Sequence, residues 1–360
     1  MSADSTPLRV AYTVEQCWHS VPGGTAVAAL RIGRELARRS DVQLELVAGR
    51  HPLPPDPAYT PHDSVHMLPI GRTALYEAWT RLGWPKVEAV TGPIDVTHAT
   101  GLIPAATSAP LIVTIHDVAF LHTPERFTRH GARLMTRSLK VADKRAARIV
   151  TSSQASFDDL VDHGVAADRI RLVPLGVDVL PATADEVDAA RTAAGVDDFI
   201  LFVGTVEPRK NLPRLAEAVA SSNLDLPLVV AGAAGWGEVT VTAEADVRFL
   251  GHVDDATLRG LYAAATVFAY PSEREGFGLP VAEAMAQSTP VVTSSGTSTE
   301  EVAGGAAVLV DPLDIGSIAD GLECALGDTD ELARRGRARA EQLTWSAAAD
   351  ATLDVYRELA

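Results

Sequence analysis

Two glutamates bracket the start of a predicted helix in the second half of the chain and could bind a polar ligand there. Glu275 and Glu283 have seven residues between them, and Pro280 falls where a missing N–H costs no helical hydrogen bond. Gly276 and Gly278 let backbone amides approach an anion at the helix N-terminus. Carboxylates accept hydrogen bonds from hydroxyls, so the pattern favours a ligand with a phosphate flanked by sugars. The alternative is an ordinary helix start, with Glu283 capping it or facing solvent.

Two adjacent cations follow an apolar run that ends in Gly204. Arg209 and Lys210 precede a predicted helix that Asn211 could cap. An arginine binds two phosphate oxygens at once and a lysine adds a point charge, so the pair could neutralise a departing diphosphate. For an isolated pair, a solvated basic turn is the competing interpretation.

The first half of the chain holds weaker candidates of two kinds. Gly23 and Gly24 lie between the first predicted strand and a helix, where backbone amides could meet a phosphate or simply form a tight turn. His116 ends a strand and could bind a sugar hydroxyl or a developing charge, while Asp117 could bind an acceptor or orient His116. A structural histidine is the alternative, and His98 is a poorer candidate of the same kind. The G-x-G-x-x-G spacing is missing, which disfavours a dinucleotide site.

Short apolar runs alternate with segments of helical period, and this rhythm predicts parallel sheets covered by helices. Strands are expected at 8–13, 43–49, 95–100, 110–117, 148–153, 170–176, 199–205, 227–233, 247–252, 266–272, 290–296 and 306–312. Helices are expected at about 24–40, 126–148, 153–163, 211–221, 254–265, 280–288, 314–326 and 330–342. The rhythm lapses over 180–185, which we interpret as a linker. The predicted class is α/β, with two Rossmann-like doubly wound domains, 1–180 and 186–344, facing across a cleft.

Composition narrows the function classes. The 360 residues include 47% hydrophobic and 22% charged residues and carry a net charge of -16, which disfavours a nucleic-acid binder that relies on bulk positive charge. Cys17 and Cys324 are far apart and suggest neither a disulfide framework nor a zinc site. The sequence shows no basic leader and no long apolar span, so we expect a cytoplasmic protein.

Two further segments bear on metals and membranes. Asp328-Thr329-Asp330 is a D-x-D pattern between two predicted helices, where helix capping is the better interpretation, so no metal site is predicted. The segment 126–148 carries eight Arg or Lys residues against one Asp. Such a helix could meet an anionic membrane surface or an anionic acceptor, and a solvated helix face is the preferred alternative.

Together, these motifs resemble the retaining glycosyltransferases of family 4, which have the GT-B fold. The resemblance rests on the Glu-x7-Glu pair, the Glu-Pro-Arg-Lys-Asn-Leu block, the Gly-Gly-Thr turn and the Thr-Ile-His-Asp strand end, in the family's order. The closing segment 345–360 is similar to the C-terminal helix that packs back on the first, acceptor-binding domain in such proteins.

The resemblance implies a role for each matching residue. Arg209, Lys210 and Gly204 would bind the donor diphosphate, with Gly24 approaching from the first domain. Glu283 would bind the ribose, and Glu275 would hold hydroxyls of the transferred sugar. The remaining implied assignments are backbone contacts from Phe277, Gly278 and Leu279 to the donor, His116 beside the sugar, and Gly23 and Asp117 on the acceptor side.

The resemblance also implies an activity and its substrates. We expect transfer of a hexose, with mannose from GDP-mannose favoured, to a saccharide or lipid-linked acceptor, with retained anomeric configuration and no cofactor or metal. Peripheral membrane contact would involve the basic segment 126–148. A non-hydrolysing nucleotide-sugar epimerase and a non-catalytic nucleotide-sugar-binding protein are the alternatives, the latter disfavoured because His116, Arg209, Lys210, Glu275 and Glu283 are all present.

Overall fold

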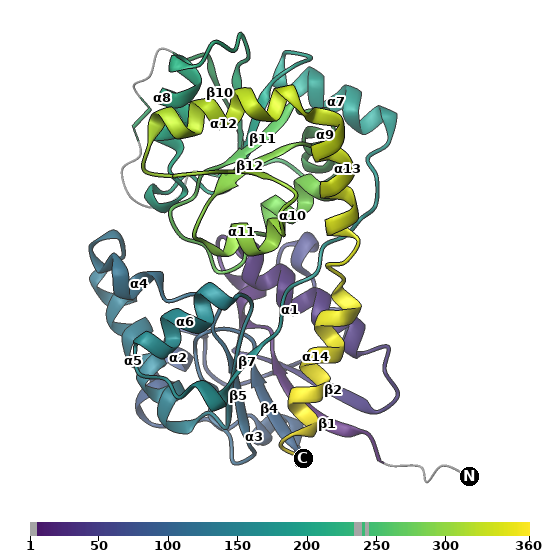
Figure 1. Ribbon diagram of the computed structural model, residues 1–360. Coiled ribbons are helices and arrows are strands. Elements are labelled where there is room, and N and C mark those ends of the chain that lie inside the picture. The colour runs from purple at the N-terminus through teal and green to yellow at the C-terminus, as the bar shows by residue number, and fades with distance from the viewer. Residues whose placement is uncertain (1–5, 234–239, 242–244) are drawn as a thin grey trace. The chain divides into compact units, whose positions relative to one another are not determined.

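The chain forms two compact units in a computed structural model that describes residues 6–233, 240–241 and 245–360 (Figure 1). The first unit comprises Met1–Gly176 and Trp345–Ala360, and the second comprises Val177–Thr344. Each unit is built around one parallel sheet, and the predicted α/β class with two doubly wound sheets is confirmed.

The first unit has a seven-stranded sheet in the order β3-β2-β1-β4-β5-β6-β7. The strands are β1 (Leu8–Thr13), β2 (Val42–Ala48), β3 (Val65–Met67), β4 (Val96–Ala99), β5 (Leu111–Thr114), β6 (Arg148–Thr151) and β7 (Ile170–Leu172). The helices are α1 (Gly23–Leu36), α2 (Arg72–Arg81), α3 (Glu88–Thr91), α4 (Ala119–His122), α5 (Arg129–Arg145), α6 (Gln154–Asp162) and α14 (Trp345–Arg357). Strands β4 and β5 are buried along their whole length because helices cover both faces of the sheet.

The second unit has a six-stranded sheet in the order β10-β9-β8-β11-β12-β13. The strands are β8 (Ile200–Val203), β9 (Leu228–Ala231), β10 (Val247–Gly251), β11 (Val267–Tyr270), β12 (Val291–Ser294) and β13 (Val308–Val310). The helices are α7 (Ala184–Ala194), α8 (Leu212–Ser221), α9 (Asp255–Ala264), α10 (Leu279–Ala286), α11 (Ser298–Ala303), α12 (Ile315–Gly327) and α13 (Thr329–Ala340), with the short 3₁₀ helix η5 (Pro208–Lys210) before α8.

The expected linker at 180–185 is wrong only at its end: residues 173–183 form no helix or strand, whereas 184 and 185 already belong to α7. Thr183 Oγ1 accepts a hydrogen bond from the Glu186 amide, and Glu186 Oε2 accepts one from the Thr183 amide at 2.9 Å, a reciprocal capping box that starts α7 at Ala184. Gln287 also holds the segment by hydrogen bonds to Leu180 and Ala182. The small polar residues that are typical of linkers are here a helix cap.

The C-terminal helix α14 belongs to the first unit and contacts α1. The hydroxyl of Tyr356 lies 2.7 Å from Nδ1 of His98 in β4, and the other ring nitrogen of His98 lies 2.7 Å from Thr114 Oγ1. Burial lowers the pKa of His98 to about 3, so the ring is neutral. His98 is therefore a structural histidine that ties α14 to the sheet.

Candidate functional site

Charged side chains gather beyond the carboxyl ends of β8 and β11, which are neighbours in the second sheet. We call Glu207, Arg209, Lys210, Tyr270 and Glu275 the strand-end cluster. Arg209 lies 2.6 Å from Glu275 Oε2 and 2.8 Å from Glu207 Oε1. The ammonium of Lys210 lies 3.3 Å from Glu275 Oε1 and donates to the hydroxyl of Tyr270, which donates to the same Glu275 oxygen at 2.8 Å. The structure thus brings together three residues predicted from sequence, Arg209, Lys210 and Glu275.

Burial and charge oppose each other in this cluster. Burial raises the pKa of Glu275, but the charges of Arg209 and Lys210 lower it by a larger amount. The resulting pKa is about 2, below the ordinary value. Burial lowers the pKa of Lys210, and Glu275 opposes that change. Two cations face two carboxylates, so their formal charges cancel. Groups held in this way could stabilise a developing diphosphate charge without reorganising.

Local geometry explains why the cations are held there. Gly204 directly follows β8 with φ 148°, and a Cβ on it would lie 3.0 Å from Cδ and Nζ of Lys210. Asn211 does not cap α8 with its side chain, contrary to the sequence prediction. Its Nδ2 instead donates to the carbonyl oxygens of Pro271 at 3.0 Å and of Pro312 at 2.5 Å. Asn211 therefore ties together the loops that follow three strands.

The loop before α10 is fixed from both sides of Glu275. Ser272 Oγ donates to Glu275 Oε1 at 2.9 Å, and Ser298 Oγ donates to the Glu275 carbonyl at 2.7 Å. Gly278 has φ 103°, and a Cβ there would lie 2.7 Å from Thr299 Cγ2. The neighbouring Phe277 and Leu279 are buried. Pro280 lies in the first turn of α10, as predicted.

Glu283 lies inside α10 and is half-buried. Its Oε2 accepts a hydrogen bond from the hydroxyl of Tyr262 at 2.8 Å, and the residue at the helix cap is Gly278. Glu283 therefore does not cap the helix. Its expected contact with a ribose stays a prediction.

The candidates of the first unit come from two separate places, the start of α1 and the loop after β5. Helix α1 begins at Gly23, and both Gly23 and Gly24 are exposed. His116 Nδ1 lies 3.4 Å from Ser152 Oγ, and burial lowers the pKa of the ring. Asp117 Oδ1 accepts from the amide of Ala119, at the start of α4. His116 is thus available as a neutral hydrogen-bonding group, whereas Asp117 makes a local contact.

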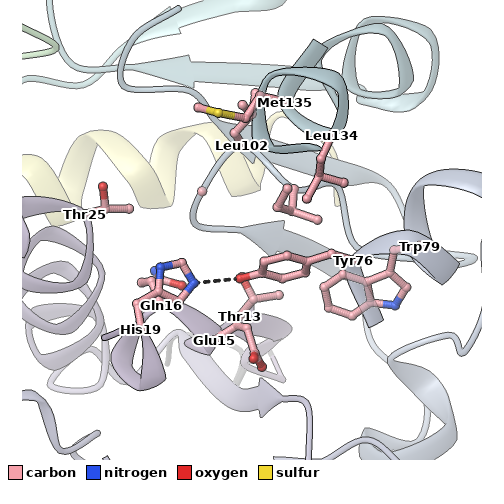
Figure 2. Close-up of a pocket in the computed structure, with 13 residues that line it drawn as sticks. Thr13, Glu15, Gln16, His19, Thr25, Tyr76, Trp79, Leu102, Leu134 and Met135 are labelled. Atoms are coloured by element: carbon pink, nitrogen blue, oxygen red, sulfur yellow. Dashed lines mark hydrogen bonds between the residues drawn. The ribbon is translucent and has the colours of Figure 1, made fainter. Parts of the chain in front are cut away.

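A cavity of about 360 Å³ opens in the first unit (Figure 2). It is lined by Thr13, Glu15, Gln16, His19, Thr25, Tyr76, Trp79, Gly101, Leu102, Ile103, Gly131, Leu134 and Met135. The sequence analysis missed this cavity because its walls come from segments far apart in the chain. The one sequence feature that could have indicated the cavity is that several of its residues follow predicted strands. A search for the G-x-G-x-x-G pattern does not detect such a site.

Possible metal ligands occur in the D-x-D pattern and, among the described residues, in one group of three side chains. The capping interpretation of Asp328 is wrong, because its side chain makes no cap hydrogen bond to α13, although it occupies the cap position. Within the described residues, His122, Asp159 and His163 place one ligand atom each within 4.8 Å of one another. His122 and Asp159 already form a pair at 3.1 Å. None of these residues belongs to the strand-end cluster.

Sequence reasoning also missed residues that complete the second-unit site. Tyr270 is the last residue of β11, and Glu207 follows β8, so both occupy strand ends where ligands of such sheets bind. That position could have indicated them. Tyr262, which donates to Glu283, lies in the last turn of α9 and carries no comparable signal.

Family models and curated relatives match both units of the chain. The family model described as "Glycosyl transferases group 1" matches residues 185–342, and "Glycosyltransferase Family 4" matches residues 22–179. The chain is 34% identical to the O-antigen chain mannosyltransferase B of Escherichia coli over 69% of this chain and 70% of that protein. It is 31% identical to the D-inositol 3-phosphate glycosyltransferase of Xylanimonas cellulosilytica, over 93% of this chain and 92% of that protein.

The fold has a solved counterpart at low sequence identity. Anabaena HepE, solved in complex with UDP and glucose, superimposes with a TM-score of 0.72 at 19% identity, over 98% of this chain and all of that one. Both units therefore have the architecture of GT-B enzymes. The chain belongs to glycosyltransferase family 4 and is a glycosyltransferase with the GT-B fold.

Proposed function

We propose that this enzyme transfers a hexose, with mannose favoured, from a nucleotide diphosphate sugar to a saccharide or lipid-linked acceptor, with retention of anomeric configuration and without a metal ion. The observation that carries the proposal is the strand-end cluster, in which Arg209 and Lys210 are both held against the buried Glu275. A buried, pre-positioned pair of cations is suited to the charge that develops on a departing diphosphate. The positive end of α10 adds to this stabilisation.

The roles of the individual residues follow from their contacts. Arg209 and Lys210 bind the diphosphate, with Gly204 leaving room for the lysine side chain. Glu275 aligns both cations, and it reaches a sugar hydroxyl when the hydroxyl replaces one of its present donors. Glu283, oriented by Tyr262, binds the ribose hydroxyls. His116 donates or accepts a hydrogen bond at the transferred sugar as a neutral ring.

GDP-mannose is the favoured donor, because a mannosyltransferase of Escherichia coli is 34% identical to this chain. The MMP alpha-(1->4)-mannosyltransferase of Mycolicibacterium hassiacum, at 29% identity over 84% of this chain, supports the same preference. The front-face mechanism expected of the family assigns deprotonation of the acceptor to the departing phosphate. No side chain is therefore assigned as the general base.

Membrane contact is not part of the proposed activity. Within the described residues, no helix combines the length and the apolar character needed to cross a bilayer. Helix α5 (Arg129–Arg145) makes up most of the basic segment 126–148, and three of its apolar side chains face the interior of the first unit. Leu134 and Met135 line the cavity of the first unit, and Leu139 is buried.

Nucleotide binding tests the donor site directly. We would measure thermal shifts with GDP, UDP, ADP and their sugar conjugates, with and without EDTA, since a ligand that binds only the folded state raises its stability. One nucleotide should stabilise the wild-type protein equally in both conditions. Lys210→Ala should abolish the shift and lower turnover by at least about 10²-fold. Lys140→Ala, at an exposed lysine of α5, is the matched control.

Two results would contradict the proposal. A shift that survives in Lys210→Ala would remove this lysine from the donor site, and a strict requirement for a divalent metal would exclude metal-independent transfer. The product's anomeric configuration, read by NMR with the identified donor, tests retention. Release of a free epimer instead of a new glycoside would favour the epimerase alternative.

A further inference from the structure

The cavity of the first unit lies at a topological switch point of the sheet. Strands β1 and β4 are neighbours, while the strands that follow them in the chain, β2 and β5, lie on opposite sides of the pair. Open parallel sheets bind ligands beyond the carboxyl ends of strands at such a point. Thr13 ends β1 and Gly101 follows β4, and both line the cavity. Its volume of about 360 Å³ is within the usual range for small-molecule sites.

One wall of the cavity is polar and uncharged apart from a single carboxyl group. Gln16 Nε2 donates to Thr100 Oγ1 at 2.6 Å, and His19 Nε2 lies 2.9 Å from the hydroxyl of Tyr76. Burial, with nearby positive charge, lowers the pKa of His19 to about 4, so the ring is neutral at pH 7. These groups can exchange hydrogen bonds with the hydroxyls of an uncharged ligand.

The opposite wall is apolar. Figure 2 shows Leu102, Leu134 and Met135 across the cavity from Gln16 and His19. Leu134 and Met135 come from α5, and Leu102 comes from the segment after β4, so two separate elements supply this wall. A hydrocarbon group placed there would be removed from water, which strengthens binding by about fourfold for each buried methylene.

The charge of the lining disfavours an anionic ligand. All the residues that line the cavity are described, and they include the carboxyl group of Glu15 but no lysine or arginine. Glu15 accepts from the amide of Gly49 and pairs with His51 at 2.8 Å. The positive charge of Arg72 is close enough to lower the pKa of Glu15, but Arg72 is not part of the lining, and its Nη1 donates to the carbonyl of Trp18. Burial raises the pKa of Glu15, which favours its neutral form, so the case against an anion rests on the lining: it offers a phosphate no cation to compensate the loss of water.

We infer that this cavity binds the acceptor as an uncharged glycoside with a hydrocarbon aglycone, its hydroxyls toward Gln16 and His19 and its aglycone against Leu102, Leu134 and Met135. The inference rests on the proposed transferase function and deepens it by naming the acceptor class. An uncharged acceptor would also distinguish this chain from its relatives that are called D-inositol 3-phosphate glycosyltransferases, because the substrate in that name carries a phosphate.

Calorimetry on the full chain without donor tests the inference. The titrants are hexyl α-D-mannopyranoside below its micelle concentration, methyl α-D-mannopyranoside and D-inositol 3-phosphate. The hexyl glycoside should bind with one-to-one stoichiometry and at least about tenfold more tightly than the methyl glycoside. The inositol phosphate should bind more weakly than either. Equal binding of the two glycosides, or tighter binding of the phosphate, would overturn the inference.

A substitution in the apolar wall locates the binding. Leu134→Asn should remove the preference for the hexyl chain and leave binding of the methyl glycoside within about twofold. Leu172→Asn, at an exposed leucine of β7, is the matched control and should preserve the preference. A hexyl preference that survives in Leu134→Asn would place the aglycone elsewhere and refute the assignment.

Turnover separates failure of this inference from failure of the proposed function. With the donor identified, Leu134→Asn should raise KM for the hexyl glycoside by at least about tenfold and KM for the methyl glycoside by much less, whereas Leu172→Asn should leave both KM values unchanged. Transfer to D-inositol 3-phosphate with no transfer to either glycoside would overturn the acceptor class while the transferase function stands. Absence of any nucleotide binding would instead contradict the proposed donor site, and the calorimetric result would still decide what the cavity binds.

Discussion

Replacing Glu275 by glutamine should destabilise the second unit in a pH-dependent way. The substitution keeps the shape of the side chain but removes the charge that Arg209 and Lys210 face at 2.6 and 3.3 Å. In the native state the carboxyl pKa falls from its ordinary value of 4.5 to about 2. With about 1.4 kcal/mol for each pKa unit, the ionised carboxylate contributes about 3 kcal/mol at pH 7. The side chain is only 10% exposed, so solvent screens little of this stabilisation.

The sign of the pH dependence follows from the lowered pKa. Above about pH 4.5 the group is ionised in both the folded and the unfolded state, and the whole stabilisation is present. As the pH falls toward 2, the unfolded chain takes up a proton first and the stabilisation is lost. The difference between wild type and Glu275→Gln should therefore be largest near pH 7 and should shrink below pH 4.5.

Hydrogen exchange is the suitable assay, because a two-domain chain need not unfold in one step. Peptides that carry β8 and β11 report the local free energy of opening around the cluster. Glu331→Gln is the control, since Glu331 also forms an ion pair with an arginine, Arg334, but at the surface, where salt screens it. Protection in Glu275→Gln within about 0.5 kcal/mol of wild type at pH 7, or a loss that does not change with pH, would refute the electrostatic reasoning.

Four other outcomes are expected. Gly204→Ala should lower turnover and weaken nucleotide binding, because the new Cβ would press on the Lys210 side chain 3.0 Å away; unchanged binding constants by calorimetry would count against this. Tyr356→Phe should lower the free energy of unfolding by about 1–2 kcal/mol in denaturant titrations, since His98 loses a buried partner. His98 has a lowered pKa, so wild type should lose stability as the pH falls below about 6.5, and His98→Asn should show a shallower loss. Asp328→Ala should leave turnover unchanged, with or without EDTA.

The strands were predictable because burial on both sheet faces leaves apolar runs that stand out from the rest of the chain. Ile200–Val203 and Val267–Tyr270 are buried throughout and fall inside predicted strands. The edge strand β3 has three residues and no fully buried one, so it lacks that signal. Helix α7 was missed for a different reason, because its cap residues Thr183 and Glu186 are polar types that also occur in linkers.

For the site, the sequence could predict three of the residues that take part and that they follow the carboxyl ends of strands, but not how their side chains pair. Arg209, Lys210 and Glu275 follow two strands that turn out to be neighbours, and parallel strands bring their carboxyl ends to one edge. The direction of each side chain is a property of packing, which the sequence does not display. For that reason the pairing of Glu275 with both cations, and the hydroxyl of Tyr270 between them, were not foreseen.

The internal pairing changes how an acidic chain can bind an anionic donor. A protein with a net charge of -16 repels a diphosphate at long range, so the binding site must supply positive charge locally. An isolated buried lysine would lose its proton, and the contact with Glu275 opposes that loss. The carboxylate thus favours the charged form of Lys210, and under the proposed function an arriving diphosphate would compete with it for Arg209 and Lys210. This competition would weaken binding of the donor in the ground state and leave both cations available for the larger charge of the transition state.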